Sequence, residues 1–180
     1  MTMVMFTKNR EVKGLHQLFL DQIRDLYNVE HQQIRAFPRF AEAALHPEYR
    51  TIVNKHFEQT KNHILRLEKI FENLGENPTD RECAAVKALI QKSHDIAEKN
   101  YGPRALEAAL IAAVQYIEHY EIAGYGAVRS FARQLGDDES ANLLQQTLNE
   151  EAHMDRLLSE LAEYEVNSRA AEVSTRLFHA

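Results

Sequence analysis

The sequence predicts an all-α protein in which four long helices and one short helix form a single domain. Glycine and proline, which interrupt helices, number only 6 and 4 among 180 residues. Alanine, leucine, glutamate, glutamine and arginine, which favour helices, are abundant. Apolar residues also recur three and four positions apart through long segments, which is the period of an amphipathic helix. Together these observations favour helices throughout the chain.

The first two predicted helices form a hairpin. We expect the first helix to run from about residue 12 to 45, with a local kink at Pro38. The His46-Pro47 pair is expected to end this helix, because the residue before a proline disfavours helical geometry. The second helix is predicted over residues 47–74, and Gly75 follows it as a C-terminal glycine.

A second hairpin follows a loop and a short helix. Residues 75–80 (GENPTD) are typical of a loop, and a short helix is predicted over 83–99. Gly102-Pro103 breaks the pattern and opens a fourth helix, which is expected over 104–135 and ends at Gly136. Asp137 or Asp138 is expected to cap a fifth helix that reaches about residue 164. We expect residues 1–165 to form the domain and residues 166–180, which are weakly patterned, to be a tail ordered only by a partner.

Two long helical hairpins joined by a connection that carries a short helix match one known architecture. This is the ferritin-like four-helix bundle, here with an additional short helix in the crossover. An up-and-down bundle of the cytokine type and a plain α-hairpin scaffold remain open from the pattern alone.

Composition excludes several classes of function. The formal net charge of −6 gives no reason to expect a nucleic-acid partner. No apolar run approaches the roughly 20 residues needed to span a bilayer, so no membrane partner is expected. The first residues become charged too soon for a signal peptide, and the single cysteine, Cys83, excludes an internal disulfide. The expected location is therefore the cytoplasm.

Two glutamates occupy positions where a soluble helix normally carries an apolar residue. Glu30 and Glu121 both fall near the middle of the apolar stripe of their predicted helices. A buried carboxylate costs several kcal/mol unless a positive group meets it. Because this costly feature occurs twice, on the first and fourth helices, we expect the two glutamates to share a metal ion.

The two hairpins repeat one another, and the repeat gives these glutamates partners. Thr60 follows Glu30 by thirty residues, and Glu151 follows Glu121 by the same interval. Ferritin-like dimetal sites take one glutamate from each of two helices and a Glu-x-x-His pair from each of the other two. The predicted metal-binding layer consists of Glu30, Glu121, Glu151 and His63, with His56 and Asp155 nearby.

This layer is an incomplete dimetal pattern. When the two hairpins are aligned, Thr60 occupies the position of Glu151, where a symmetric dimetal site would have a glutamate. Met154 occupies the position of His63, where such a site would have a histidine. The helical wheel favours Glu151 over Glu150, although Glu150-x-x-His153 is a formal Glu-x-x-His match, because His153 points away from the stripe. Glu118 lies about 90° off the stripe, so it is expected at a hydrogen-bonding surface or at the site through its rotamer.

Residues 118–126 (EHYEIAGYG) resemble the EHYEIAxYG signature of the YciE/YciF ferritin-like stress-protein family. The segment from His56 to Thr60 is similar to the H-x-x-x-T pattern of that family's second helix, and the resemblance covers about residues 15–163. It implies a ferritin-like bundle that is usually dimeric, takes part in bacterial stress responses and carries a dimetal site. Gln59 departs from the family pattern, in which a glutamate is common. The positions that match the family's pattern are Glu30, His56, Glu121, Glu151 and Asp155.

Two functions follow as hypotheses. The first is a stress-response protein with an iron or manganese pair in the bundle core, acting as an oxidase, a peroxidase or a metal-handling protein. The second is a non-enzymatic, homodimeric structural stress protein with a metal-free polar layer. A mineral-storing cage is a third possibility, but the chain shows no feature that specifies a shell. Catalytic residues and enzymatic activity are left open by the sequence.

Overall fold

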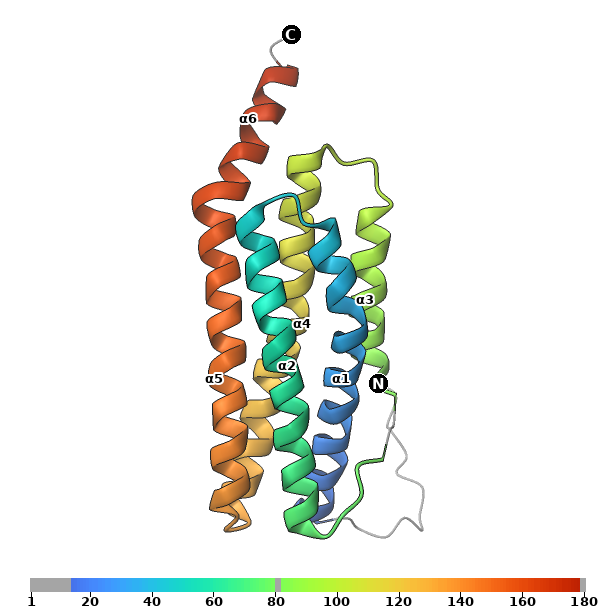
Figure 1. Ribbon diagram of the computed structural model, residues 1–180, viewed down its shortest axis with the longest axis vertical. Helices are drawn as coiled ribbons and strands as arrows, with labels where there is room; N and C mark the ends of the chain where they lie inside the picture. The colour runs from blue at the N-terminus through green and yellow to red at the C-terminus, as the bar shows by residue number, and fades with distance from the viewer. Residues whose placement is uncertain (1–13, 80–81, 179–180) are drawn as a thin grey trace, which may run out of the picture.

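The computed structural model describes residues 14–79 and 82–178 and has the predicted helical architecture (Figure 1). Its four long helices are α1 (Leu15–Ala43), α2 (Pro47–Leu74), α4 (Pro103–Gln134) and α5 (Asp138–Leu161). Within the bundle α1 contacts α2 and α4, and α5 contacts the same two helices. The short helix α3 (Ala84–Ala97) lies outside this group, mainly against α4 and more loosely against α1. The prediction of an all-α, ferritin-like four-helix bundle with a short crossover helix is confirmed.

Local side-chain chemistry sets the helix ends. The His46 side chain accepts a hydrogen bond from the Glu48 backbone N–H at 3.3 Å, and Pro47 opens α2. Gly75 ends α2 in the left-handed region with φ of 66°. Asp137, one of the two predicted caps, accepts a hydrogen bond from the Ser140 backbone N–H at 2.9 Å. The sequence therefore placed these three helix ends correctly.

Two predicted boundaries differ from the structure. Helix α1 continues through Pro38 and ends at Ala43, and its predicted start lies outside the described residues. Residues 166–180 were expected to be ordered only by a partner, but a π-helical turn, Ala162–Val166, continues α5 into α6 (Asn167–Phe178). Val166 is buried, and Arg104 donates to the Arg169 carbonyl at 3.1 Å, which anchors the start of α6 to α4. The rest of α6 extends past the end of the bundle (Figure 1).

The bundle core consists of two apolar clusters on either side of a polar layer. One cluster includes Phe37, Tyr49 and Leu158, and the other includes Phe19, Phe71 and Leu144. Buried ionisable side chains from α1, α2, α4 and α5 lie between these clusters along the helices. No helix of the described residues is long and apolar enough to cross a membrane.

Two glycines of the bundle are expected to respond to alanine in opposite directions. Gly75→Ala should lower the free energy of unfolding by about 1–2 kcal/mol, because its φ of 66° is strained for a residue with a Cβ. Gly126→Ala should raise it by roughly 0.8–1 kcal/mol, since Gly126 lies inside α4 and an added Cβ meets nothing within 4 Å. Chemical denaturation of both variants tests this, and equal effects would contradict the assigned cap.

Candidate metal centre

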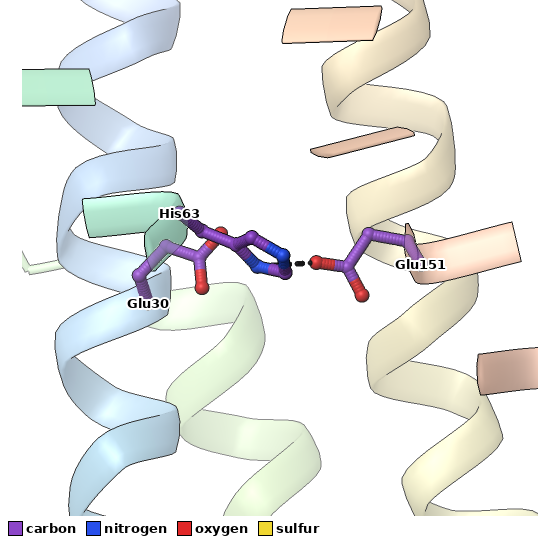
Figure 2. Close-up of side chains that lie close together, drawn as sticks. All are labelled: Glu30, His63 and Glu151. Carbon is purple, nitrogen blue, oxygen red and sulfur yellow. Dashed lines mark ion pairs between the residues drawn. The ribbon is translucent and has the colours of Figure 1, made fainter. Parts of the chain in front are cut away.

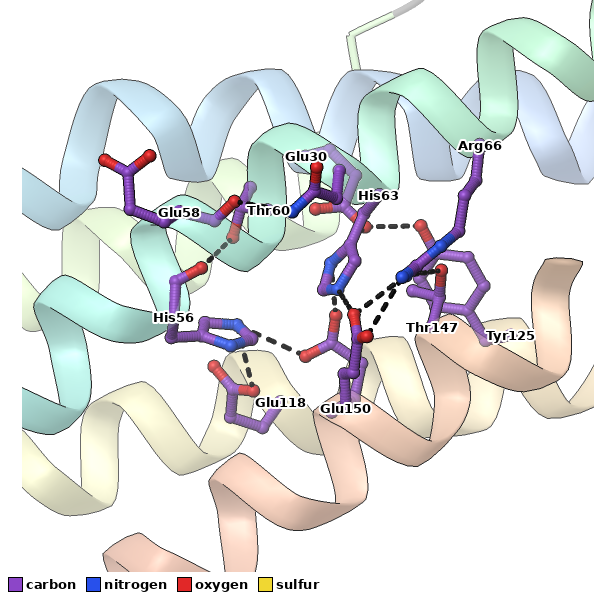
Figure 3. A network of polar contacts seen from close by, with 12 residues as sticks. Glu30, His56, Glu58, Thr60, His63, Arg66, Glu118, Tyr125, Thr147 and Glu150 are labelled. Carbon is purple, nitrogen blue, oxygen red and sulfur yellow. Dashed lines mark hydrogen bonds and ion pairs between the residues drawn. The ribbon is translucent and has the colours of Figure 1, made fainter.

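The polar layer contains six ionisable side chains that are almost completely removed from solvent. All four long helices contribute to it, and Figure 3 shows Glu30, His56, His63 and Glu118 of this layer between the helices. Each of the six is at most 1% exposed. They are Glu30 of α1, His56 and His63 of α2, Glu118 and Glu121 of α4, and Glu151 of α5.

The first group of possible ligands consists of Glu30, His63 and Glu151 (Figure 2). The Nδ1 atom of His63 lies 2.9 Å from Oε1 of Glu151 and 3.4 Å from Oε1 of Glu30. One donor atom from each residue falls within 4.8 Å of the other two. Three buried N and O donors at such separations could converge on one cation.

The second group consists of His56, Glu118 and Glu151. The Nε2 atom of His56 lies 3.5 Å from Oε2 of Glu118 and 3.3 Å from Oε2 of Glu151. Glu151 therefore directs Oε1 toward His63 of the first group and Oε2 toward His56 of the second. A carboxylate in this position can serve two neighbouring cations at once.

The carboxylates of α4 lack hydrogen-bond partners. Neither oxygen of Glu118 or Glu121 accepts a hydrogen bond from any residue that the structure describes. Oε2 of Glu30 also lacks a partner among these residues, and the Glu151 oxygens face only the two imidazoles. Leaving a buried polar group unsatisfied costs roughly 1–3 kcal/mol. The layer is therefore costly for the chain alone, and bound cations would satisfy these oxygens.

Burial and mutual repulsion raise the pKa of both α4 carboxyl groups. Burial raises the pKa of Glu118 well above its usual value, and the charges of Glu151 and Glu121 raise it further. Burial likewise raises the pKa of Glu121, with further contributions from Glu151 and Glu30. Both shifts favour protonation relative to an exposed glutamate, so a cation that binds there competes with protons.

Glu151 and His63 form the charged pair of the layer. Burial would raise the pKa of Glu151, but His56 and His63 beside it hold this pKa well below its usual value. Burial would lower the pKa of His63, but Glu30, Glu150 and Glu151 outweigh burial and raise it far above its usual value. Without a cation, a protonated His63 thus neutralises part of the negative charge.

An outer group of polar side chains fixes the orientation of these residues. The Nε2 atom of His63 lies 2.8 Å from Oε2 of Glu150, so Nδ1 faces Glu30 and Glu151. Arg66 donates to both Glu150 oxygens, at 2.8 and 2.9 Å. Burial alone would raise the pKa of Glu150, but His63 and Arg66 lower it to about 2. From α4, the Tyr125 hydroxyl donates to Glu30.

The two ligand groups contain four of the six predicted metal ligands, Glu30, His56, His63 and Glu151, and the structure buries Glu121 in the same layer. Asp155 belongs to neither ligand group, and its role as a ligand stays a prediction. It accepts a hydrogen bond from Gln115 Nε2 at 3.0 Å and lies 3.3 Å from His119 Nε2. Asp155 lies on the flank of α5, so its carboxylate is used in contacts with α4 at the edge of the bundle.

The sequence left two positions open for Glu118. It was expected at a surface or at the site, and the structure has it fully buried beside His56. Its signal in the sequence was the spacing from Glu121, because residues three apart lie on one helix face. With Glu118 the layer holds four carboxylates and two imidazoles, so Thr60 and Met154 no longer leave the donor set short. The choice of Glu151 over the partly exposed Glu150 agrees with their burial.

Glu150→Gln is expected to weaken metal binding without removing a ligand. The neutral amide can no longer attract the Nε2–H of His63 strongly, so Nδ1 loses basicity and orientation. Removing such an outer partner typically costs about 10–100-fold in metal affinity. Competition with a chelator of known affinity measures this loss. Glu160→Gln, an exposed change on the same helix, serves as the control, and equal affinities of all three proteins would contradict the assigned role.

Comparison with known proteins agrees with this architecture. The family model described as a domain of unknown function, DUF892, matches residues 14–171. The chain belongs to the DUF892 family. Among DUF892 relatives, Protein YciF of Escherichia coli K12 is 34% identical over 160 residues, which are 88% of this chain and 96% of YciF. The predicted resemblance of the chain to the YciE/YciF family is thereby confirmed.

Solved structures of DUF892-like proteins have the same fold. The crystal structure of the E. coli stress protein YciF matches with a TM-score of 0.83 and 34% identity, covering 87% of this chain and 99% of that one. YcfI of Rhodopseudomonas palustris, described as a candidate structural protein, matches with a TM-score of 0.81 and 33% identity. The match covers 85% of this chain and 98% of YcfI. A Xanthomonas campestris protein at 19% identity has a TM-score of 0.71 over 89% and 98%, which shows the fold alone.

Proposed function

We propose that this chain is a ferritin-like stress protein that binds a pair of iron or manganese ions in the polar layer of its bundle. The supporting observation is the donor set of four buried carboxylates and two buried imidazoles. This is the number of carboxylates and histidines that ferritin-like dimetal proteins use. Nitrogen and oxygen donors suit iron and manganese. The stress role rests on its relative YciF, which is described as a stress protein.

The residues of each ligand group divide between two ions. Glu30 and His63 would hold one ion, and His56 and Glu118 would hold the other. Glu151 would contribute to both ions. Glu121, which is buried in the same layer, would add the fourth carboxylate. Four carboxylates neutralise two divalent cations, which removes the repulsion within the layer. Bound iron or manganese would supply redox chemistry toward dioxygen or peroxide, or a means of metal handling.

The chain's own residues prepare this layer for cations. Glu150 and Arg66 hold the His63 ring so that Nδ1 faces the two carboxylates, and Tyr125 holds one oxygen of Glu30. The apolar clusters at either end keep bulk water out of the layer. Low polarity strengthens the attraction between the carboxylates and a cation.

Metal loading is expected to give two ions per chain and a more stable protein. A ligand that binds only the folded state stabilises it by about 2.7 kcal/mol at a free concentration one hundred times its Kd. Elemental analysis of protein loaded anaerobically with Fe(II), or with Mn(II), measures the stoichiometry, and thermal unfolding measures the stabilisation. Magnesium serves as the control ion. A metal content near zero together with an unchanged Tm would contradict the proposal.

A second function is supported by a different observation. His63, Glu150 and Arg66 form a connected network of charges that needs no metal ion, and the relative YcfI is described as a candidate structural protein. On this hypothesis the chain is a homodimeric, non-enzymatic stress protein with a metal-free layer. It predicts that added metals leave the Tm unchanged. It also predicts that dilution dissociates the dimer and unfolds the chain together, which ultracentrifugation and circular dichroism measure.

A further inference from the structure

A second polar site lies between α1 and α3, outside the four-helix core. Here the structure contains a cavity of about 330 Å³, and none of the six residues of the candidate metal centre lines it. Arg35 and Arg39 of α1 form one wall, and Lys87 and His94 of α3 form the other. A cavity of this size corresponds to the lower range of known small-molecule sites, about 300–1,000 Å³.

Positive charge dominates this cavity although the whole chain carries a net charge of −6. Lys87 binds Glu82, which is the acidic side chain of the lining, at 2.8 Å. Arg35 and Arg39 have no acidic or hydrogen-bonding partner for their guanidinium groups among the described residues. They lie four residues apart on one helix face, where like charges repel. Two exposed guanidiniums that line a cavity and have no partner among the described residues favour an anion with several oxygen acceptors.

His94 provides a separate observation that points to a ligand. Its Nε2 atom is buried and has no hydrogen-bond partner among the residues that the structure describes. The His94 ring packs edge-on against Phe40, with centroids 6.5 Å apart, so its position is fixed by the core. Buried polar atoms in folded proteins nearly always have a partner. An anion in the cavity beside His94 would supply one.

An adjoining apolar cavity indicates that the ligand is larger than an inorganic ion. This second cavity, of about 290 Å³, shares Arg39 and His94 with the first. Phe40, Ala43, Ala97 and Leu110 provide its apolar lining, and Glu98 is its acidic residue. The combined groove therefore offers cations for a charged head group and, next to them, a wall for a small organic group.

We propose that the groove between α1 and α3 binds a small phosphomonoester. Its phosphate carries a charge of about −1.5 to −2 at neutral pH and three acceptor oxygens, which suit the guanidiniums of Arg35 and Arg39 and an Nε2–H of His94. The organic group lies against the apolar lining of the adjoining cavity. A carboxylate head group carries only one charge and would leave part of the positive charge of the groove uncompensated.

Calorimetric titration of the full-length protein with phenyl phosphate tests the proposal. Saturable binding of one molecule per chain is expected, with inorganic phosphate and benzoate each at least about tenfold weaker, a difference of 1.4 kcal/mol. Weaker binding of inorganic phosphate would show that the apolar lining contributes to the affinity. Weaker binding of benzoate would show that the groove prefers a dianionic head group. Absence of saturable binding, or equal affinity for phenyl phosphate and benzoate, overturns the proposal.

Matched variants assign the binding to this groove. The double variant Arg35→Gln/Arg39→Gln should lose at least about tenfold in affinity for phenyl phosphate, because charge-assisted hydrogen bonds are removed. Arg133→Gln, which removes an exposed arginine near the end of α4, should bind like the wild type. Equal losses in the double variant and the control would reveal unspecific charge attraction and overturn the assignment. Metal content should be unchanged in all variants, so this result is independent of the proposed metal centre.

Discussion

Glu151→Gln is expected to reduce the metal content from two ions per chain to nearly none. Glu151 is the residue that belongs to both ligand groups, with one oxygen facing His63 and the other facing His56. A neutral amide cannot compensate two cations, so both ions lose a charged ligand. Removing one partner of a buried ion pair also costs about 3–5 kcal/mol of stability in the metal-free protein.

A second variant separates loss of ligands from loss of fold. Glu118 belongs to only one of the two ligand groups, so Glu118→Gln should retain one ion per chain. Elemental analysis after size-exclusion chromatography measures both variants, and circular dichroism verifies their helical content. The exposed Glu160→Gln serves as the control with two ions. If Glu151→Gln folds and retains both ions, Glu151 does not lie between two metals.

Glu121→Met is expected to stabilise the metal-free protein and to weaken its metal binding. Both carboxylate oxygens of Glu121 are buried without a hydrogen-bond donor among the described residues, so the wild-type chain bears the cost of an unsatisfied polar group. Methionine, like glutamate, has an unbranched side chain, but it is apolar and so does not bear this cost. In the presence of a chelator, the free energy of unfolding is expected to rise by about 1–3 kcal/mol. Each kcal/mol corresponds to roughly 2–4 °C in Tm. Chemical and thermal denaturation with and without metal measure the two opposing effects.

The advantage of this variant should grow with pH. Burial raises the pKa of Glu121 above its ordinary value of 4.5, so above that pH the folded chain retains a proton that the unfolded chain releases. The contribution of Glu121 to stability therefore falls as the pH rises, and the methionine variant lacks this contribution. Glu160→Met, an exposed change, should alter stability by no more than about 0.5 kcal/mol. A metal-free Glu121→Met protein that is less stable than the wild type would contradict the argument.

Much of the fold could be predicted because its determinants are local. Gly75, Gly102-Pro103 and Asp137 mark helix ends through backbone geometry and hydrogen bonds that involve only a few neighbouring residues. The helical period likewise placed Glu30 and Glu121 on buried faces, and both are fully buried. The continuation of α5 into α6 was missed because its anchor, Arg104, lies more than sixty residues away in the sequence.

The sequence by itself determined an all-helical bundle with buried glutamates on opposite hairpins, since periodicity and helix-breaking residues are properties of neighbouring residues. Only the tertiary structure decided which acids lie in the buried polar layer. Helix α4 contacts α1, α3 and α5, so its buried face is wider than one apolar stripe and includes Glu118. Asp155 lies at the edge of the α4–α5 contact and binds Gln115. Membership in a site depends on how neighbouring helices cover each face, and a single helical wheel does not contain that information.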